Sequence, residues 1–475
     1  MKKLLVLIAL AGLMLQVNAQ KQSYSYSFTI KGSQDTVAYL ASYYGEKLFY
    51  NDTVLVDKKG RFVFEGKGEK PGGIYAFVLP SQKYFEFLIA EPNFSLETDT
   101  ADFIENMRVK GSAENEIFFK QMQLVGALNN QVQPLMAERD SLSKLDAKSP
   151  RLDEIKDIML SFDEKVKSSR LKVYTDYGHL YVSQVFAATE DPIIPDDLGE
   201  ELEGKEKDKV RFDYFKAHFF DRIDFSDERV MRMPAFHKKM VRYLEKMTAQ
   251  TPDSVIVSAK EIVDMSKADT EVFRYVLNYI TSHYESSKIM GMDAVFVAMV
   301  ECYYATGDAT WLKGEKLEKL VETSDKLKPT LIGKRAPFLR MQDTSGTWRS
   351  LYDIESPITV LFIWDPDCGN CKKAMPKLEE FYQNYKDKGV ELYAVSTDFE
   401  NDKWISFLKK NPKMSWINVS DSPQHPNAFR DVYDVFSTPR LFVLDKNKII
   451  KAKRLGVEQL PDFVDFLLKE NNKDK

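Results

Sequence analysis

Two cysteines, Cys368 and Cys371, stand three residues apart, after an apolar run that predicts a strand and at the start of a predicted helix. Thiols at this spacing can close a small disulfide. At the helix N-terminus, unpaired amides and the positive end of the helix dipole favour a thiolate. A thiolate of lowered pKa is both a nucleophile and a good leaving group in disulfide exchange. We therefore expect Cys368 to be the attacking thiol and Cys371, one turn deeper, to be the resolving thiol.

Three other residues are expected to contribute to substrate binding at this pair. Thr438 and Pro439 stand directly before a predicted strand. A proline in this position can be cis, which would place the Thr438 backbone opposite the cysteines, where it can pair with an extended substrate. Trp364 ends the apolar run ahead of Cys368 and can shield the site.

The segment from Phe362 to Pro376, FIWDPDCGNCKKAMP, resembles the thioredoxin fold. More narrowly, it is similar to exported thiol-disulfide oxidoreductases of the TlpA/ResA type, over about residues 330–475. The resemblance implies a redox-active disulfide between Cys368 and Cys371, with protein thiols and disulfides as partners. It also implies an upstream electron donor in the cell envelope, and neither an organic cofactor nor a metal.

Two positions depart from this family. In members of this family a buried carboxylate often transfers the proton of the second, deeper cysteine. In this sequence the two positions where that carboxylate usually stands hold Phe362 and Ala374. Water, Lys372 or another carboxylate would then handle that proton. Asp365 and Asp367 lie near the first cysteine, and negative charge there would raise its thiol pKa. We expect a reductant or a weak oxidant.

Other chemistries fit these cysteines less well. A structural zinc site needs four ligands, and only His425, expected to be a loop residue, stands elsewhere in this segment. A thioredoxin-fold peroxidase would carry threonine in place of Asp365. The third cysteine, Cys302, lacks a basic or cysteine neighbour, so we expect a buried, small apolar residue there and not a reactive thiol.

Residues 20–113 predict strands. Apolar and polar residues alternate over positions 24–30, the period of a half-buried strand. Two short apolar runs flank residues 57–60, which predicts a hairpin. Further strands are expected at 74–79, 84–89 and 94–98. We expect a small antiparallel β-sandwich-like domain of unknown function.

Residues 114–328 predict an all-α domain, because apolar positions recur at three- and four-residue spacing. A charge run at residues 200–209 is expected to be solvated. The strand-rich part, together with residues 289–296 and 365–367, is similar to envelope proteins of Bacteroides-like bacteria that carry domains of unknown function ahead of a thioredoxin domain.

Residues 329–475 alternate predicted strands and helices, which implies an α/β fold in which helices cover both faces of a mixed sheet. The predicted strands are 358–364, 390–396, 416–419, 441–444 and 449–454. The predicted helices are 369–388, 402–411, 427–433 and 459–470.

The first 19 residues predict a signal peptide. They combine a basic start, an apolar run over residues 4–15 and a small-residue cleavage site ending at Ala19. The run is shorter than the ~20 residues of a membrane helix, and no later segment is long and apolar enough to span a bilayer. We expect an exported protein without a transmembrane anchor after cleavage. The resemblance implies the periplasm or cell envelope of a Gram-negative bacterium.

The amino-acid composition argues against two classes of protein, nucleic-acid-binding proteins and disulfide-stapled scaffolds. The 475 residues include 67 basic and 72 acidic side chains, a net charge of −5 that argues against nucleic-acid binding. Three cysteines are too few for a disulfide scaffold.

We expect a multidomain thiol-disulfide oxidoreductase that reduces or isomerises protein disulfides. The alternative is a non-enzymatic envelope protein that binds a partner or glycan and carries a passive thioredoxin-like module.

Overall fold

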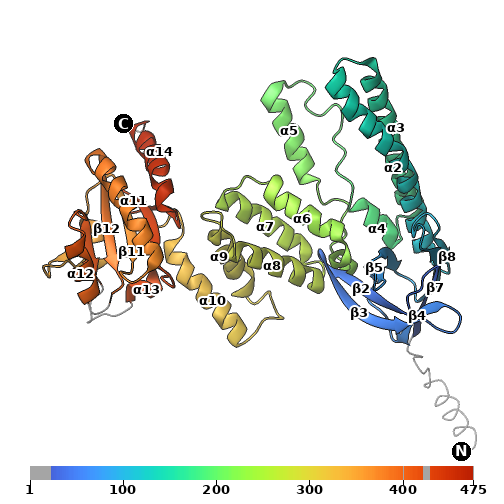
Figure 1. Cartoon of the computed structure of the whole chain (residues 1–475), viewed down its shortest axis with the longest axis horizontal. Helices are drawn as coiled ribbons and strands as arrows, with labels where there is room; N and C mark the ends of the chain where they lie inside the picture. The colour runs from blue at the N-terminus through green and yellow to red at the C-terminus, as the bar shows by residue number, and fades with distance from the viewer. Residues whose placement is uncertain (1–22, 399–400, 421–427, 474–475) are drawn as a thin grey trace, which may run out of the picture. The chain divides into compact units, whose positions relative to one another are not determined.

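The computed structural model describes residues 23–398, 401–420 and 428–473 (Figure 1). The expected signal peptide and His425 lie outside the described residues. The chain forms two compact units, the first of Met1–Met247 with Met265–Phe273 and the second of Thr248–Asp264 with Arg274–Lys475. The division into three domains at residues 113 and 328 stays a proposal.

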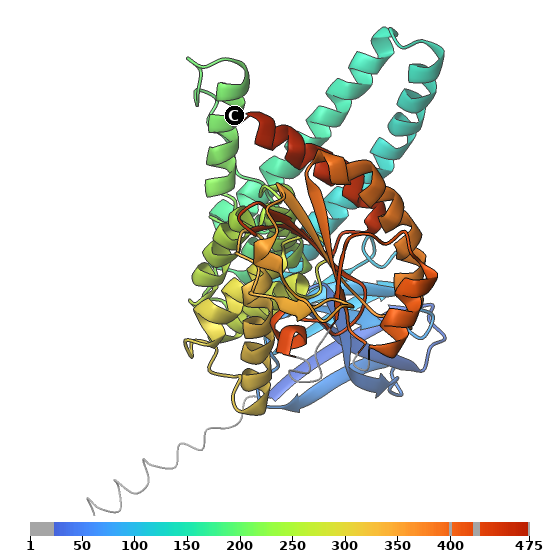
Figure 2. The ribbon, with the colours of Figure 1, turned by 90° about the vertical axis from the view of Figure 1, so that its left-hand side faces the viewer.

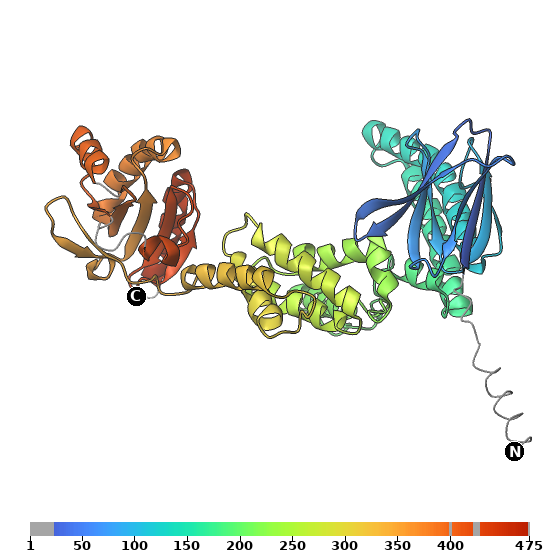
Figure 3. The ribbon, with the colours of Figure 1, turned by 90° about the horizontal axis from the view of Figure 1, so that it is seen from below.

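The strand-rich part of the first unit consists of two four-stranded sheets that face each other (Figure 3). One sheet has the order β4-β1-β7-β8 and the other β3-β2-β5-β6. The pairs are antiparallel except β1 with β7, which is parallel. The strands are β1 Ser23–Lys31, β2 Val37–Tyr44, β3 Lys47–Leu55, β4 Arg61–Lys67, β5 Gly73–Val78, β6 Tyr84–Ile89, β7 Asn93–Asp99 and β8 Arg108–Lys110.

Aromatic side chains from both sheets fill the space between them. Phe28 of β1 stacks on Phe77 of β5 with 4.7 Å between ring centroids, and both side chains are completely buried. Alternate residues of a strand point to the same face. The alternation in β1 therefore buries Tyr26, Phe28 and Ile30 together, which confirms the sandwich-like fold.

The turn at residues 57–60 forms, but the strands beside it do not make the expected hairpin. The Asp57 N–H donates to the Arg61 carbonyl at 2.7 Å, and Val56 bridges Phe62. Beyond this bridge β3 pairs with β2 and β4 pairs with β1, so the chain crosses between sheets. A turn signal reports only local geometry and does not specify which sheet each strand joins.

The helices of the first unit begin directly after the sandwich. α2 and α3 lie side by side as a helical hairpin (Figure 1). The helical chain is interrupted after α3, which ends at Tyr177, and resumes with α4 at Tyr181. Part of the charge run at 200–209 lies in α5, which has no buried residue. The helices are α2 Ala113–Leu145, α3 Pro150–Tyr177, α4 Tyr181–Ala187, α5 Gly204–Ala217 and α6 Pro234–Lys246.

More helices precede the C-terminal sheet: α7 Pro252–Ser266, α8 Thr270–Glu285, α9 Asp293–Met299, the π-helical turn η2 Val300–Tyr304 and α10 Glu315–Leu327. Cys302 lies in η2 and is half-buried, whereas a buried residue was expected. Its neighbours Tyr303 and Tyr304 take the buried positions of that turn.

The C-terminal part of the second unit is built on a mixed seven-stranded sheet of order β10-β9-β13-β12-β11-β14-β15, with helices along it (Figure 2). β12 is parallel to β11 and to β13, and the other pairs are antiparallel. The strands are β9 Arg340–Gln342, β10 Trp348–Ser350, β11 Ile358–Trp364, β12 Val390–Ser396, β13 Ile417–Ser420, β14 Arg440–Asp445 and β15 Ile450–Lys453. The helices are α11 Gly369–Tyr385, α12 Asp402–Lys410, α13 Ala428–Val432 and α14 Leu460–Lys473.

Both faces of this sheet are covered, as the thioredoxin-like fold requires. Val360, Phe362 and Trp364 of β11 share one core with α11, α12 and α14. Leu361 and Ile363 face the other core, which includes side chains of α13 and of the segment before β11. No helix of the described ranges is long and apolar enough to cross a membrane.

Candidate functional site

The end of β11 and the start of α11 fix the position of the cysteine pair. All of β11 is buried, and a short loop, Asp365 to Asp367, leads from it to Cys368. The Cys368 N–H donates to the Asp365 carbonyl at 3.1 Å. The Asp365 carboxylate accepts from the Asp367 N–H at 2.7 Å and from the Thr397 hydroxyl at 2.9 Å. Strand and loop together hold the first turn of α11 in place.

Cys368 is the N-cap residue of α11. Its backbone is extended, with φ −72° and ψ 119°, and its sulfur accepts a hydrogen bond from the Cys371 N–H at 3.3 Å. A side chain in this position satisfies an amide that the helix leaves unpaired. The sulfur is therefore held where a negative charge is stabilised by the amide and by the helix dipole.

The two thiols have different surroundings. Cys371 is completely buried, whereas Cys368 is partly exposed, and neither forms a disulfide in the structure. Burial alone would raise the pKa of Cys368, but hydrogen bonds with the side chains of Cys371 and Thr438 and with the backbone of Cys371 and Asn370 together outweigh it and lower that pKa. Burial, with the neighbouring Cys368, raises the pKa of Cys371 to about 12. A partly exposed nucleophile thus lies next to a buried, protonated thiol.

Thr438 lies against the exposed thiol. The Thr438–Pro439 peptide bond is cis, the isomer anticipated for this position. The Cys368 thiol donates to the Thr438 carbonyl, with 3.3 Å between sulfur and oxygen. The fold thus brings Cys368, Cys371 and Thr438 together from distant parts of the chain.

Trp364 does not line the exposed side of the site. Its side chain is completely buried in the core beside α11 and packs on Phe407, with 5.0 Å between ring centroids. Because β11 is buried on both faces, its last residue is enclosed like the others. Because the Trp364 side chain has no exposed surface, a protein docked at the site would not contact it. Trp364 instead packs in the core that supports α11.

The two aspartates beside Cys368 have partners of their own. The Asp365 carboxylate is occupied by the Thr397 hydroxyl and a backbone amide, and Asp367 forms an ion pair with Lys403. That pairing lowers the pKa of Asp367 itself. Hydrogen bonds to the Cys368 sulfur prevail over its burial, so the net shift of the thiol pKa is downward.

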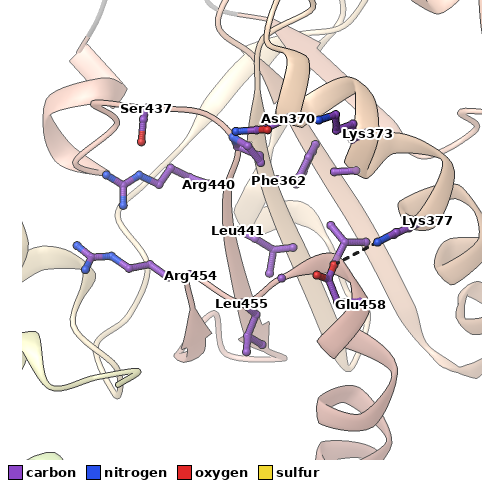
Figure 4. Close-up of a pocket in the computed structure, with 14 residues that line it drawn as sticks. Phe362, Asn370, Lys373, Lys377, Ser437, Arg440, Leu441, Arg454, Leu455 and Glu458 are labelled. Carbon is purple, nitrogen blue, oxygen red and sulfur yellow. Dashed lines mark ion pairs between the residues drawn. The ribbon is translucent and has the colours of Figure 1, made fainter. Parts of the chain in front are cut away.

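A pocket of about 420 Å³ adjoins the cysteine pair (Figure 4). Asn370, which stands between the cysteines, and Pro439 both line it. Phe362 and Ala374, at the two positions where the family often has an acid, also line it. The pocket therefore lies where the family's proton-transfer group would stand, but its wall there is apolar.

Sequence reasoning missed the basic side chains of this pocket, Lys373, Lys377, Arg440 and Arg454. A signal was present for the two lysines, which stand four residues apart and therefore share one face of a helix. The two arginines lie at the predicted strands near the far end of the chain. No local pattern indicates that they lie opposite α11.

The described residues contain no group of three or more His, Cys, Asp or Glu side chains that could hold a metal ion. The two sulfurs of the site are suited to thiol-disulfide exchange. A lowered pKa at Cys368 suits nucleophilic attack, and the bond from the Cys371 backbone N–H to the Cys368 sulfur keeps the two cysteines next to each other.

Comparison with known families matches three stretches of the chain. Residues 25–118 match a domain of unknown function (DUF4369), and residues 171–327 match a second domain of unknown function (DUF5106). Residues 356–450 match a thioredoxin-like family. The cysteine pair and the Thr438–Pro439 bond both lie within that last stretch.

Relatives of the C-terminal part carry the name thiol-disulfide oxidoreductase ResA. The Bacillus thuringiensis (strain Al Hakam) protein is 30% identical over 139 residues, which are 29% of this chain and 78% of the relative. A Bacillus cereus protein is 28% identical over 138 residues, with the same shares. A solved domain of a possible thiol-disulfide isomerase from Cytophaga hutchinsonii is 42% identical, covers 30% of this chain and 97% of its own, and has a TM-score of 0.28. Through its C-terminal part, the chain belongs to the thioredoxin-like thiol-disulfide oxidoreductase family.

Proposed function

We propose that this protein is an exported thiol-disulfide oxidoreductase of the Gram-negative cell envelope that reduces or isomerises protein disulfides. The observation that carries the proposal is the position of the Cys368 sulfur. It caps α11, lies 3.3 Å from both the Cys371 amide and the Thr438 carbonyl, and has a lowered pKa. The buried second thiol lies within the same helical turn.

In the proposed reaction, the Cys368 thiolate attacks one sulfur of a substrate disulfide. A mixed disulfide forms, the substrate S–S bond breaks, and the other substrate sulfur leaves as a thiolate that takes up a proton. Cys371 then loses its proton and attacks the Cys368 sulfur. The second substrate thiol is released, and the Cys368–Cys371 disulfide remains. Two electrons pass to the substrate, and a dithiol donor in the envelope restores them.

Substrate binding is assigned to the Thr438–Pro439 segment. The Thr438 backbone lies beside the reacting sulfur and can pair with an extended substrate chain, as an added strand does. Trp364 is completely buried, so we assign it to the core beside the site and not to substrate binding. The proton of Cys371 leaves without the usual carboxylate, and we propose that water in the adjoining pocket accepts it.

The proposal is tested by the reduction of insulin with dithiothreitol as electron donor, followed as turbidity. We expect the wild-type protein to accelerate precipitation and the Cys368→Ser variant to match the uncatalysed rate. Cys302→Ser is the matched control and should retain the wild-type rate. Equal rates for wild type and Cys368→Ser would exclude the oxidoreductase and leave the binding-protein alternative.

A further inference from the structure

The pocket beside the cysteine pair has an apolar floor. Phe362, Leu441 and Leu455 line it between the lysines of α11 and the two arginines (Figure 4). Its volume of about 420 Å³ falls within the ~300–1,000 Å³ of small ligand pockets. Asn370 and Pro439 at its edge connect it to the reacting sulfur, since Pro439 follows the Thr438 carbonyl that contacts Cys368. A substrate chain paired with Thr438 would therefore pass this opening.

Basic side chains line the pocket on two sides. Lys373 and Lys377 come from α11, while Arg440 and Arg454 come from the opposite side, from β14 and the residue after β15 (Figure 4). Glu458 is the acidic residue among the lining residues. It lies 3.8 Å from Lys377, and the side chains of both partners are exposed. An exposed pair of this kind contributes little and leaves Lys377 available.

The two arginines share one carboxylate. Asp434 lies 3.8 Å from Arg440 and 3.8 Å from Arg454, too far for a tight bidentate pair with either. The Arg440 side chain is only 17% exposed, and its buried Nε has no hydrogen-bond partner within the described residues. The long contacts with Asp434 leave other guanidinium N–H groups, above all those of the half-exposed Arg454, able to bind an anion.

We propose that this pocket binds an acidic segment of the protein whose disulfide reacts at Cys368, which rests on the function proposed above. An extended chain advances ~3.3 Å per residue. An Asp or Glu two or three residues from the substrate cysteine would therefore reach the cations, and the apolar floor would take its methylene groups or an adjacent apolar side chain. The site selects substrates by charge next to the cysteine.

Binding is tested apart from catalysis with the Cys368→Ser/Cys371→Ser protein and fluorescent peptides that lack cysteine. The peptides are identical except for two central Glu, Gln or Lys residues. We expect the Glu peptide to bind about ten-fold more tightly than the Gln peptide, the scale of one charge-assisted hydrogen bond. The preference should shrink as salt rises. Equal affinities for the Glu and Lys peptides would overturn the proposal whether or not the enzyme is active.

Selectivity is tested with the wild-type protein and two disulfide-linked peptides that carry Glu or Gln two residues from the cysteine. We expect kcat/KM to favour the Glu peptide about ten-fold. Lys373→Gln should reduce this ratio several-fold, whereas Lys446→Gln, in the exposed turn before β15, should keep it. An unchanged ratio in Lys373→Gln and in Arg440→Gln would overturn the proposal. Failure to reduce the uncharged hydroxyethyl disulfide would instead overturn the underlying function.

Discussion

At the scale of single residues, the site depends on two thiols in unlike surroundings. The roles of Cys368 and Cys371 could be predicted from their spacing. The first stands at the helix start, where backbone amides are unpaired, and the second lies one turn deeper in the helix. The electrostatics could not be predicted in the same way. The partners that occupy Asp365 and Asp367 are Thr397 and Lys403, which lie 32 and 36 residues further along the chain.

Alkylation should separate the two thiols by pH. Only the thiolate reacts with iodoacetamide, and both thiols lose a proton as pH rises. With its lowered pKa, Cys368 should reach half its maximal rate below the ~8.5 of a free cysteine, while Cys371, with a pKa of about 12, should stay slow up to about pH 10. Mass spectrometry of each peptide in a Cys302→Ser background measures both rates. A midpoint for Cys368 at or above that of free cysteine would contradict this account.

At the scale of helices and strands, periodicity predicted β1 and β11 well, and strands with less burial poorly. β11 is apolar throughout and lies between two cores, so its run of residues was an unambiguous signal. The same rule could have placed Trp364 inside the core. β3 was predicted only in part, because it is an edge strand with no buried residue in its pattern. β2 was missed although three of its residues are buried. Sheet membership on either side of residues 57–60 is set by distant pairing.

The first turn of α2 fastens this helix to an edge strand of the sandwich. The Asn115 side chain is completely buried, accepts from the Leu88 N–H and donates to the Leu88 carbonyl, each at 2.8 Å. It thus pairs with β6, the last strand of its sheet, as a neighbouring strand would.

Replacing Asn115 should therefore destabilise the sandwich. Asn115→Ala leaves two buried backbone groups without partners, and we expect the free energy of unfolding to fall by about 2–4 kcal/mol. Asn130→Ala, at an exposed position of the same helix, should change it by less than about 0.5 kcal/mol. Urea unfolding followed by circular dichroism compares the two variants. Similar midpoints for both would show that the amide pairing contributes nothing.

At the scale of the whole molecule, the second compact unit contains more than the thioredoxin-like fold. Lys453 of β15 forms an ion pair with Asp293 at the start of α9, and the two side chains are only 4% and 7% exposed. Burial lowers the pKa of Lys453, and Asp293 opposes that shift. This contact could not be predicted, because buried ion pairs between distant segments follow no local sequence pattern. The ion pair connects α9 to β15, the strand at the edge of the C-terminal sheet.

Breaking this pair should cost more than breaking an exposed one. Lys453→Met leaves the Asp293 carboxylate buried without its cation, which we expect to lower the stability of the second unit by about 3–5 kcal/mol. Lys451→Met, two residues earlier, removes a partly exposed partner of Asp445 and should have an effect below about 1 kcal/mol. Urea midpoints measured at neutral pH compare the variants. A Lys453→Met midpoint equal to that of wild type would contradict the buried pair.

We propose that Cys368, which caps α11 and lies beside Thr438, is the thiol that attacks substrate disulfides. Trapping with a Cys371→Ser variant tests it most directly, because the mixed disulfide is then not resolved. After incubation with insulin and quenching with acid, mass spectrometry locates the adduct. We expect a substrate chain linked to Cys368, with none on Cys302. Absence of an adduct, or equal adduct formation on Cys302, would contradict it.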